Sequence, residues 1–143
     1  MSFANMATVS IRREFNAVGL PFEEVTNCIT KFFFALNESG SEMPVPKEIY
    51  IAAGDSGTVV ISVLSLFQLP ENMANAVKVL RVINKFNQTS NFAQFSIEGK
   101  NVNVWTHFSR DAENIGAFVL ERCADFIDFV NQAYPILLQN AAE

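Results

Sequence analysis

The stretch that decides the fold runs from Val77 to Phe108 and reads VKVLRVINKFNQTSNFAQFSIEGKNVNVWTHF. It continues an apolar repeat with helical spacing, made of Met73, Ala76, Val77, Leu80 and Ile83. From Ala93 onward the period changes to two, which is typical of a β-strand with one buried face. The stretch therefore predicts an amphipathic helix that leads into a β-hairpin.

The hairpin is predicted to have a two-residue turn that contains Gly99, either Gly99-Lys100 or, with the same side chains on each face, Glu98-Gly99. The Gly99-Lys100 turn pairs Ile97 with Val102 and places the apolar side chains of both strands on one face. The polar face carries the only tryptophan, Trp105, between Asn103 and His107. Tryptophan is enriched in binding hot spots, but it also packs well under a helix or loop. Both interpretations of Trp105 stay open at this point.

The composition indicates one globular domain spanning residues 1–143. Half of the residues are hydrophobic and 14 are phenylalanine, which excludes a disordered chain. No run of about 18 apolar residues lacks polar interruptions, so no membrane span is expected. The net charge is −5, and no basic cluster exceeds Arg12-Arg13, which argues against nucleic-acid binding.

The compartment is predicted from the N-terminus and the cysteines. The first residues lack the pattern of a signal peptide, because the arginines follow the apolar residues. Cys28 and Cys123 are far apart in apolar settings and are expected to be buried, free thiols in a reducing compartment. We therefore expect a cytoplasmic protein.

The first half of the chain is predicted to hold one helix and three strands. The helix ends at Gly19-Leu20-Pro21. Residues Val25–Leu36 allow a helix or a strand, and their β-favouring side chains favour a strand with Cys28, Thr30, Phe32, Phe34 and Leu36 on one face. Residues 37–46 form a loop, Lys47–Ala53 a strand and 54–57 a turn. Thr58–Phe67 is apolar on both faces, which is typical of a strand that is central or covered by a partner.

The last helix is predicted to begin near Asp111 and carries more apolar surface than one sheet can cover. Its apolar residues span an arc of about 200°, whereas covering a sheet takes a stripe only somewhat wider than 100°. The surplus flank consists of Phe118, Phe129 and Ile136, with Arg122 inside it. Pro135 predicts a kink or break at Tyr134.

The predicted order is therefore α-β-β-β-α-β-β-α. Hairpins next to helices indicate an α+β fold with a mainly antiparallel sheet packed with helices.

Several short segments, in this order, resemble the YbjN-like family of small bacterial proteins, whose fold is similar to that of type III secretion chaperones. They are Gly19-Leu20-Pro21-Phe22-Glu23-Glu24, Ile83-Asn84-Lys85-Phe86-Asn87, the hairpin at 92–97 and 102–105, and Ala133-Tyr134-Pro135. The resemblance implies a secretion-chaperone-like fold over the single domain, no assigned enzymatic activity, and a dimer-forming scaffold that binds a protein or peptide. Members are often described as sensory-transduction regulators.

The residues offer no recognisable catalytic, cofactor-binding or metal-binding site. His107 is the only histidine, and its strand neighbour Ser109 forms no triad with it. One histidine and two distant cysteines do not make a metal site. Residues 54–57 lack the lysine and the following helix of a phosphate loop.

Three hypotheses follow. The first is a non-enzymatic protein- or peptide-binding module and regulator that acts as a homodimer, with the candidate interface Trp105, Phe118, Arg122, Phe129 and Ile136. The alternative is a small-ligand sensor or carrier whose pocket is lined by Phe32, Phe34 and Phe67. The third is an enzyme with an unrecognised site, which a loss of turnover in His107→Ala would reveal.

Overall fold

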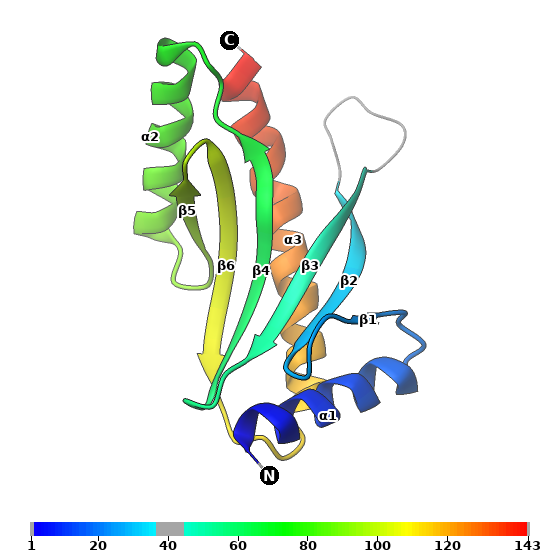
Figure 1. Cartoon of the computed structure of the whole chain (residues 1–143). Helices are drawn as coiled ribbons and strands as arrows, with labels where there is room; N and C mark the ends of the chain where they lie inside the picture. Colours follow the sequence, from blue (N-terminus) through cyan, green and yellow to red (C-terminus); the bar gives the residue numbers. More distant parts are fainter. Residues whose placement is uncertain (1, 37–44, 143) are drawn as a thin grey trace.

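A computed structural model describes residues 2–36 and 45–142 (Figure 1). Its elements are α1 (Phe3–Ala17), β1 (Glu23–Glu24), β2 (Ile29–Leu36), β3 (Val45–Ala53), β4 (Thr58–Gln68), α2 (Met73–Thr89), β5 (Gln94–Glu98), β6 (Asn101–Ser109) and α3 (Ile115–Ala142). The strands form one sheet in the order β1-β2-β3-β4-β6-β5, and all neighbours are antiparallel. The predicted α+β class is confirmed, with β1 as an additional strand of two residues.

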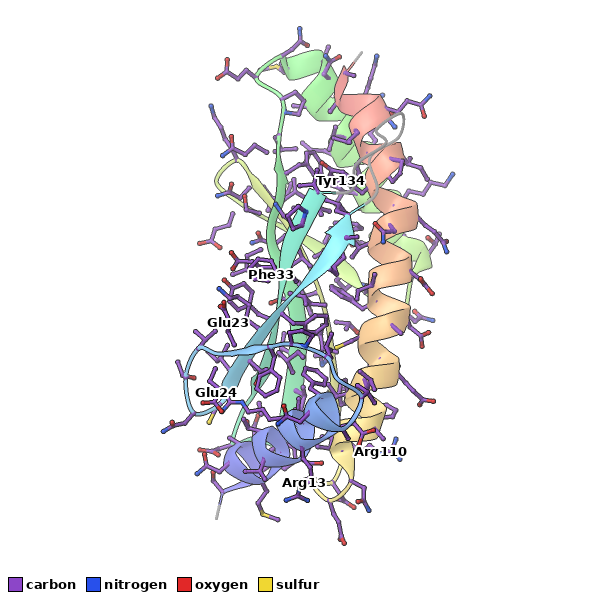
Figure 2. The ribbon with its side chains drawn as sticks, turned by 90° about the vertical axis from the view of Figure 1, so that its right-hand side faces the viewer. Arg13, Glu23, Glu24, Phe33, Arg110 and Tyr134 are labelled. Atoms are coloured by element: carbon purple, nitrogen blue, oxygen red, sulfur yellow. The ribbon has the colours of Figure 1, made fainter. Side chains whose placement is uncertain are left out.

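The helices pack on one face of the sheet. The long helix α3 runs along this face, α1 crosses its N-terminal end, and α2 lies beside β5 (Figure 1). The core between them is made of inward-facing side chains such as Ile49, Ile61, Val104 and Phe126, all essentially without solvent exposure. In the view turned by 90°, Phe33 points away from α3, so the opposite sheet face has no helix over it (Figure 2).

The β5–β6 hairpin has the predicted register. Phe95 lies opposite Val104 and Ile97 opposite Val102, and the turn is made by Gly99 and Lys100. Gly99 has a φ of +64°, a left-handed conformation that glycine adopts without a steric cost. The local pattern was sufficient here because turn length and side-chain alternation together fix a hairpin register.

The first two long strands differ from the prediction mainly at their ends. The ambiguous segment is a strand from Ile29, with Thr30, Phe32, Phe34 and Leu36 buried on one face, so the predicted face is confirmed over these residues. The strand β3 begins at Val45, two residues before the predicted start. The loop predicted for 37–46 falls on residues 37–44, which lie outside the described part, and on the first two residues of β3.

Strand β4 is central, between β3 and β6, as predicted, but it is not buried on both faces. A β-bulge interrupts its pairing with β6 between Val63 and Phe67, and Ser65 there has a φ of 52°. The extra residue moves Leu66 to the helix face with Val63, while Leu64 is exposed on the other face. Leu64 and Leu66, which an uninterrupted alternation would place on one face, therefore lie on opposite faces.

Helix α2 buries only part of the predicted stripe, namely Ile83. Val79 and Ile83 are buried and Val82 and Phe86 pack partly against the core, whereas the predicted core residues Met73, Val77 and Leu80 are exposed. The sequence makes two apolar stripes on this helix, and the positions of β5 and α3 decide which stripe is buried.

Helix α3 begins at Ile115, four residues after the predicted start at Asp111. Its first turn is capped from a distant element, because Ser10 of α1 accepts a hydrogen bond from the Gly116 backbone N–H at 3.0 Å. This capping partner is 106 residues away in the sequence, which explains why a local capping pattern misplaced the start.

The predicted break at Tyr134 is absent. Helix α3 continues through Pro135 to Ala142. Packing of the buried residues on both sides of the proline, Ala133, Tyr134 and Leu137, holds the helix in place despite the missing backbone donor.

Candidate protein-binding surfaces

An apolar stripe lies on the outer side of α2. Met73, Val77 and Leu80 are 80%, 39% and 41% exposed, and their spacing of four and three residues places them on one side of the helix. Ile97 of the neighbouring strand β5 is also exposed and lies on the same face of the strand as Phe95. This face is turned toward α2, because the ring centroids of Phe95 and Phe86 of α2 are 5.7 Å apart. We call Met73, Val77, Leu80 and Ile97 the α2 patch.

The α2 patch lies beside the edge strand β5, which α2 covers in part, because the Asn87 side chain accepts a hydrogen bond from the Phe95 N–H and donates one to the Phe95 carbonyl oxygen. Strand β5 is the last strand in the sheet order, so its outer edge has no strand partner within the described chain. Exposed apolar side chains beside an edge strand favour association with another polypeptide. This combination is the clearest association signal in the structure.

The helix-free face of the sheet is a second candidate surface. Phe33 and Leu64 are 52% and 56% exposed on it. Trp105 lies half-buried on this face, with its ring 5.4 Å from that of His107 and with Ser62 and Gln94 as cross-strand neighbours. The tryptophan is therefore placed on the sheet surface away from α3.

Charged residues occupy the β1–β3 side of this face. The Lys31 ammonium lies 2.9 Å from a Glu23 carboxylate oxygen and 3.5 Å from one of Glu48, to which the Tyr50 hydroxyl donates a hydrogen bond. The contact with Glu23 raises the pKa of Lys31, and the Tyr50 hydrogen bond lowers the pKa of Glu48. These groups contact one another within the chain, with one ammonium between two carboxylates.

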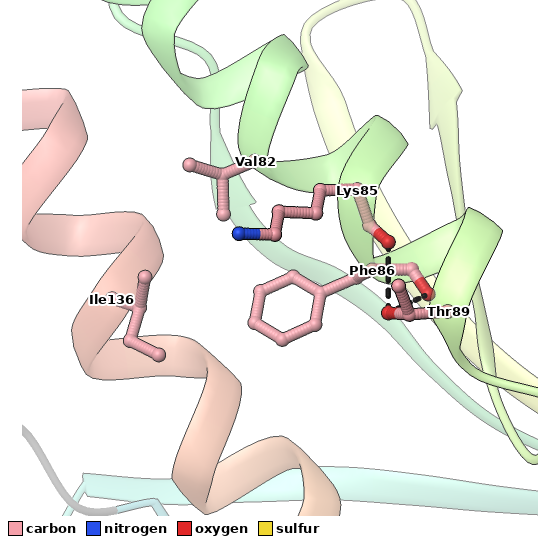
Figure 3. A pocket seen from close by; sticks show the side chains of 5 residues that line it. All are labelled: Val82, Lys85, Phe86, Thr89 and Ile136. Carbon is pink, nitrogen blue, oxygen red and sulfur yellow. Dashed lines mark hydrogen bonds between the residues drawn. The ribbon is translucent and has the colours of Figure 1, made fainter.

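The predicted flank of α3 is divided by the fold. The Phe129 ring packs against the rings of Phe86, Phe92 and Phe95 at 5.9–6.4 Å, so α2 and β5 cover it. Ile136 is exposed and, with residues of α2, lines an apolar groove of about 280 Å³ between α2 and α3 (Figure 3). The α2 residues of this groove are Val82, Lys85, Phe86 and Thr89.

The remaining flank residues form an aromatic and cationic cluster. The Phe118 ring lies edge-on to that of Phe108, with centroids 4.8 Å apart. The Arg122 guanidinium lies 4.7 Å from the Phe92 ring centroid and 5.8 Å from that of Phe118. Arg110 approaches Phe118 to 4.2 Å. We call Arg110, Phe118 and Arg122 the arginine cluster.

The three phenylalanines of the alternative ligand pocket are packed in the fold. Phe32 and Phe34 are buried, and the Phe32 ring lies edge-on to that of Phe15 at 5.5 Å. Phe67 is half-buried, with its ring 6.4 Å from that of Tyr134. None of the three lines the groove between α2 and α3. The small-ligand hypothesis stays a prediction.

Reactive side chains are separated from one another. Burial raises the pKa of the Cys123 thiol to about 12, so the thiol stays protonated at neutral pH. His107 is exposed on β6 and stacks near Trp105. Within residues 2–36 and 45–142, no three histidine, cysteine or acidic side chains gather as metal ligands would.

Within residues 2–36 and 45–142, no helix combines the length and the apolar character needed to cross a bilayer.

The sequence missed the α2 patch, although a signal for it exists. On a helical wheel, Met73, Val77 and Leu80 form one stripe and Val79 and Ile83 another, more than 100° away from it. A helix with two apolar stripes has one for the core and one for a further contact. The predicted repeat joined Ile83 to Met73, Val77 and Leu80 as one stripe. The exposed apolar surface of α2 was therefore not recognised.

Comparisons with known proteins support the fold. No family model matches the chain, and no curated protein matches it in sequence. The crystal structure of the ExsC–ExsE complex contains a similar fold, with a TM-score of 0.58 and 12% identity over 92% of this chain and 96% of that one. The crystal structure of the Yersinia pestis type III secretion chaperone SycH, in complex with a YscM2 fragment, matches with a TM-score of 0.45 and 12% sequence identity. The match covers 87% of this chain and 98% of that one. The chain therefore shares the fold of the matching chain in the ExsC–ExsE complex.

Proposed function

We propose that this chain is a non-enzymatic, chaperone-like protein-binding module that acts as a homodimer. The observation that carries the proposal is the α2 patch, an apolar stripe on a helix beside an edge strand of the sheet. A second copy is the occupant that fits it best. Two copies related by a two-fold axis would place the same patch on both sides, which makes an apolar surface self-complementary.

The helix-free sheet face and the flank of α3 would then serve the partner polypeptide. Trp105 offers a large apolar area together with one hydrogen-bond donor, the combination that dominates binding energies in protein interfaces. A similar fold has been crystallised in the ExsC–ExsE complex, which supports polypeptide binding as the use of this architecture. The partner of this chain is proposed to be a protein or peptide.

Regulation in the cytoplasm is the biological setting that we propose. Cys28 and Cys123 are both free, as expected in a reducing compartment. The order of the short segments that resemble YbjN-like proteins supports this proposal. The regulatory role that we propose for this chain is exerted by binding another protein.

A charged substitution in the α2 patch tests the dimer. Val77→Asp should shift the protein from dimer to monomer, because it places two carboxylates in an apolar two-fold contact. The matched control is Val9→Asp on α1, since Val9 is an exposed helical valine outside the patch. Sedimentation velocity on both variants measures the effect. A loss of dimer in both variants, or in neither, would contradict the proposal.

A further inference from the structure

Two arginines near the start of α3 have no polar partner within the described chain: Arg122 lies in the helix, and Arg110 directly follows β6. Neither Arg110 nor Arg122 takes part in the four ion pairs of residues 2–36 and 45–142, and the Nε of Arg122 is buried without a hydrogen-bond acceptor. Carboxylates are not scarce, since the chain has 15 acidic and 10 basic residues. A buried donor without an acceptor is costly, so its retention needs an explanation.

The surrounding rings place both guanidiniums beside one aromatic side chain. Arg110 lies 4.2 Å and Arg122 5.8 Å from the centroid of Phe118, and Phe92 and Phe108 hold Arg122 from other directions. Cation–π contacts stabilise the guanidinium groups but do not satisfy their N–H donors. The cluster therefore presents positive charge and unused donors next to an apolar surface.

We propose that the arginine cluster binds the carboxylate of an acidic side chain in the partner polypeptide. The guanidinium fork matches a carboxylate in shape and charge, and the exposed part of Phe118 suits an apolar residue next to the acid. Two unpaired cations in a chain of net charge −5 supply the charge complementarity for such a residue. This inference rests on the proposed protein-binding function and names the chemistry of one contact.

The first test uses the wild-type protein and a minimal probe. N-acetyl-aspartyl-leucine amide is titrated while the arginine side-chain resonances are followed by NMR. The signals of Arg110 and Arg122 should shift and saturate, with a Kd on the order of millimolar for so few contacts. The asparaginyl analogue, which lacks the charge, should bind at least about tenfold more weakly. Equal shifts with both peptides, or none with either, would overturn the proposal.

Variants test whether the two arginines act as the receptor. Arg110→Gln, at an exposed position, and Arg122→Lys, which keeps the charge but loses the fork, should each weaken binding of the aspartyl peptide about tenfold. Arg13→Gln is the control, because Arg13 is exposed on α1 and outside the cluster. Unchanged binding in Arg110→Gln and Arg122→Lys, or equal loss in Arg13→Gln, would contradict the assignment.

The dimer and the carboxylate site can fail separately. Sedimentation of Arg110→Gln should still give the wild-type mass, because the arginine cluster is distinct from the α2 patch. If the Arg110→Gln variant were monomeric, the acidic side chain bound by the arginine cluster would belong to the second copy of this chain. That result would overturn the proposal that it belongs to a separate partner polypeptide. A monomeric wild type that still binds the aspartyl peptide would contradict only the proposed dimer.

Discussion

Gly116 is the residue at which α1 and α3 meet. A Cβ atom added there would lie 2.3 Å from the Ser10 carbonyl oxygen and 2.9 Å from the Glu14 Cβ. Both are far closer than atoms in contact normally approach, and the first belongs to the backbone of α1. The approach also lets Ser10 accept the hydrogen bond from the Gly116 N–H. The packing of the two helices therefore depends on the absence of a side chain at this position.

Gly116→Ala should lower the free energy of unfolding by about 1–3 kcal/mol, because α1 must move to admit the methyl group. Urea unfolding followed by Trp105 fluorescence measures the change. Gly54→Ala is the matched control, since its Cβ would meet its neighbours at 3.6–3.7 Å. Equal stabilities of the Gly116→Ala variant and the wild type would contradict the close approach of the helices.

The two cysteines differ in accessibility. Cys123 is 2% exposed, as predicted, whereas Cys28 precedes β2 and is partly exposed, so its predicted burial is wrong. A disulfide-exchange reagent at mildly alkaline pH should therefore modify Cys28 in the folded protein, and both thiols only in denaturant. Counting the released chromophore with and without urea checks this expectation. Rapid modification of Cys123 in the folded chain would contradict its burial.

The same burial gives a pH dependence with a definite sign. The thiol of Cys123 has an ordinary pKa of 9.0, and burial raises it to about 12 in the folded chain. Above pH 9 the unfolded chain loses this proton while the folded chain keeps it. The contribution of Cys123 to stability is therefore complete below pH 9 and decreases as the pH rises towards 12. Chemical unfolding across this pH range should therefore show that the Cys123→Ser variant loses less free energy of unfolding than the wild-type protein does.

At the scale of the elements, local patterns were sufficient wherever the partner is close in sequence. The β5–β6 hairpin has its predicted turn and register, and the buried face from Thr30 to Leu36 was predicted from alternation alone. The predictions failed where a residue distant in sequence contributes to the local structure. Ser10 sets the start of α3, and the β4 bulge depends on Asn103, whose side chain accepts a hydrogen bond from the Ser65 N–H at 2.7 Å.

Helix α3 contains Pro135, which cannot donate a backbone hydrogen bond within the helix. Pro135→Ala should raise the free energy of unfolding by about 1–3 kcal/mol, because alanine restores the donor and has a much higher helix propensity. Thermal and urea unfolding measure the gain. Pro70→Ala is the control, since Pro70 lies between β4 and α2, outside any helix. A loss of stability in Pro135→Ala would show that the helix needs the proline geometry.

At the scale of the whole molecule, the sequence predicted that surplus apolar surface exists but placed it on α3. The fold covers Phe129 with α2 and β5, leaves Ile136 of α3 exposed, and also exposes Met73, Val77 and Leu80 on α2. A single sequence reports how apolar a helix is, whereas the side that faces solvent depends on where the other elements dock. The roles of Trp105, Phe118, Arg122 and Ile136 in a protein interface stay predictions.

The central claim is that two copies pair through the α2 patch. Light scattering on the wild-type protein, coupled to size exclusion at tens of micromolar, tests it most directly. The account predicts a mass of twice the 15.9 kDa of one chain. A mass of 15.9 kDa that persists over the whole concentration range would contradict it.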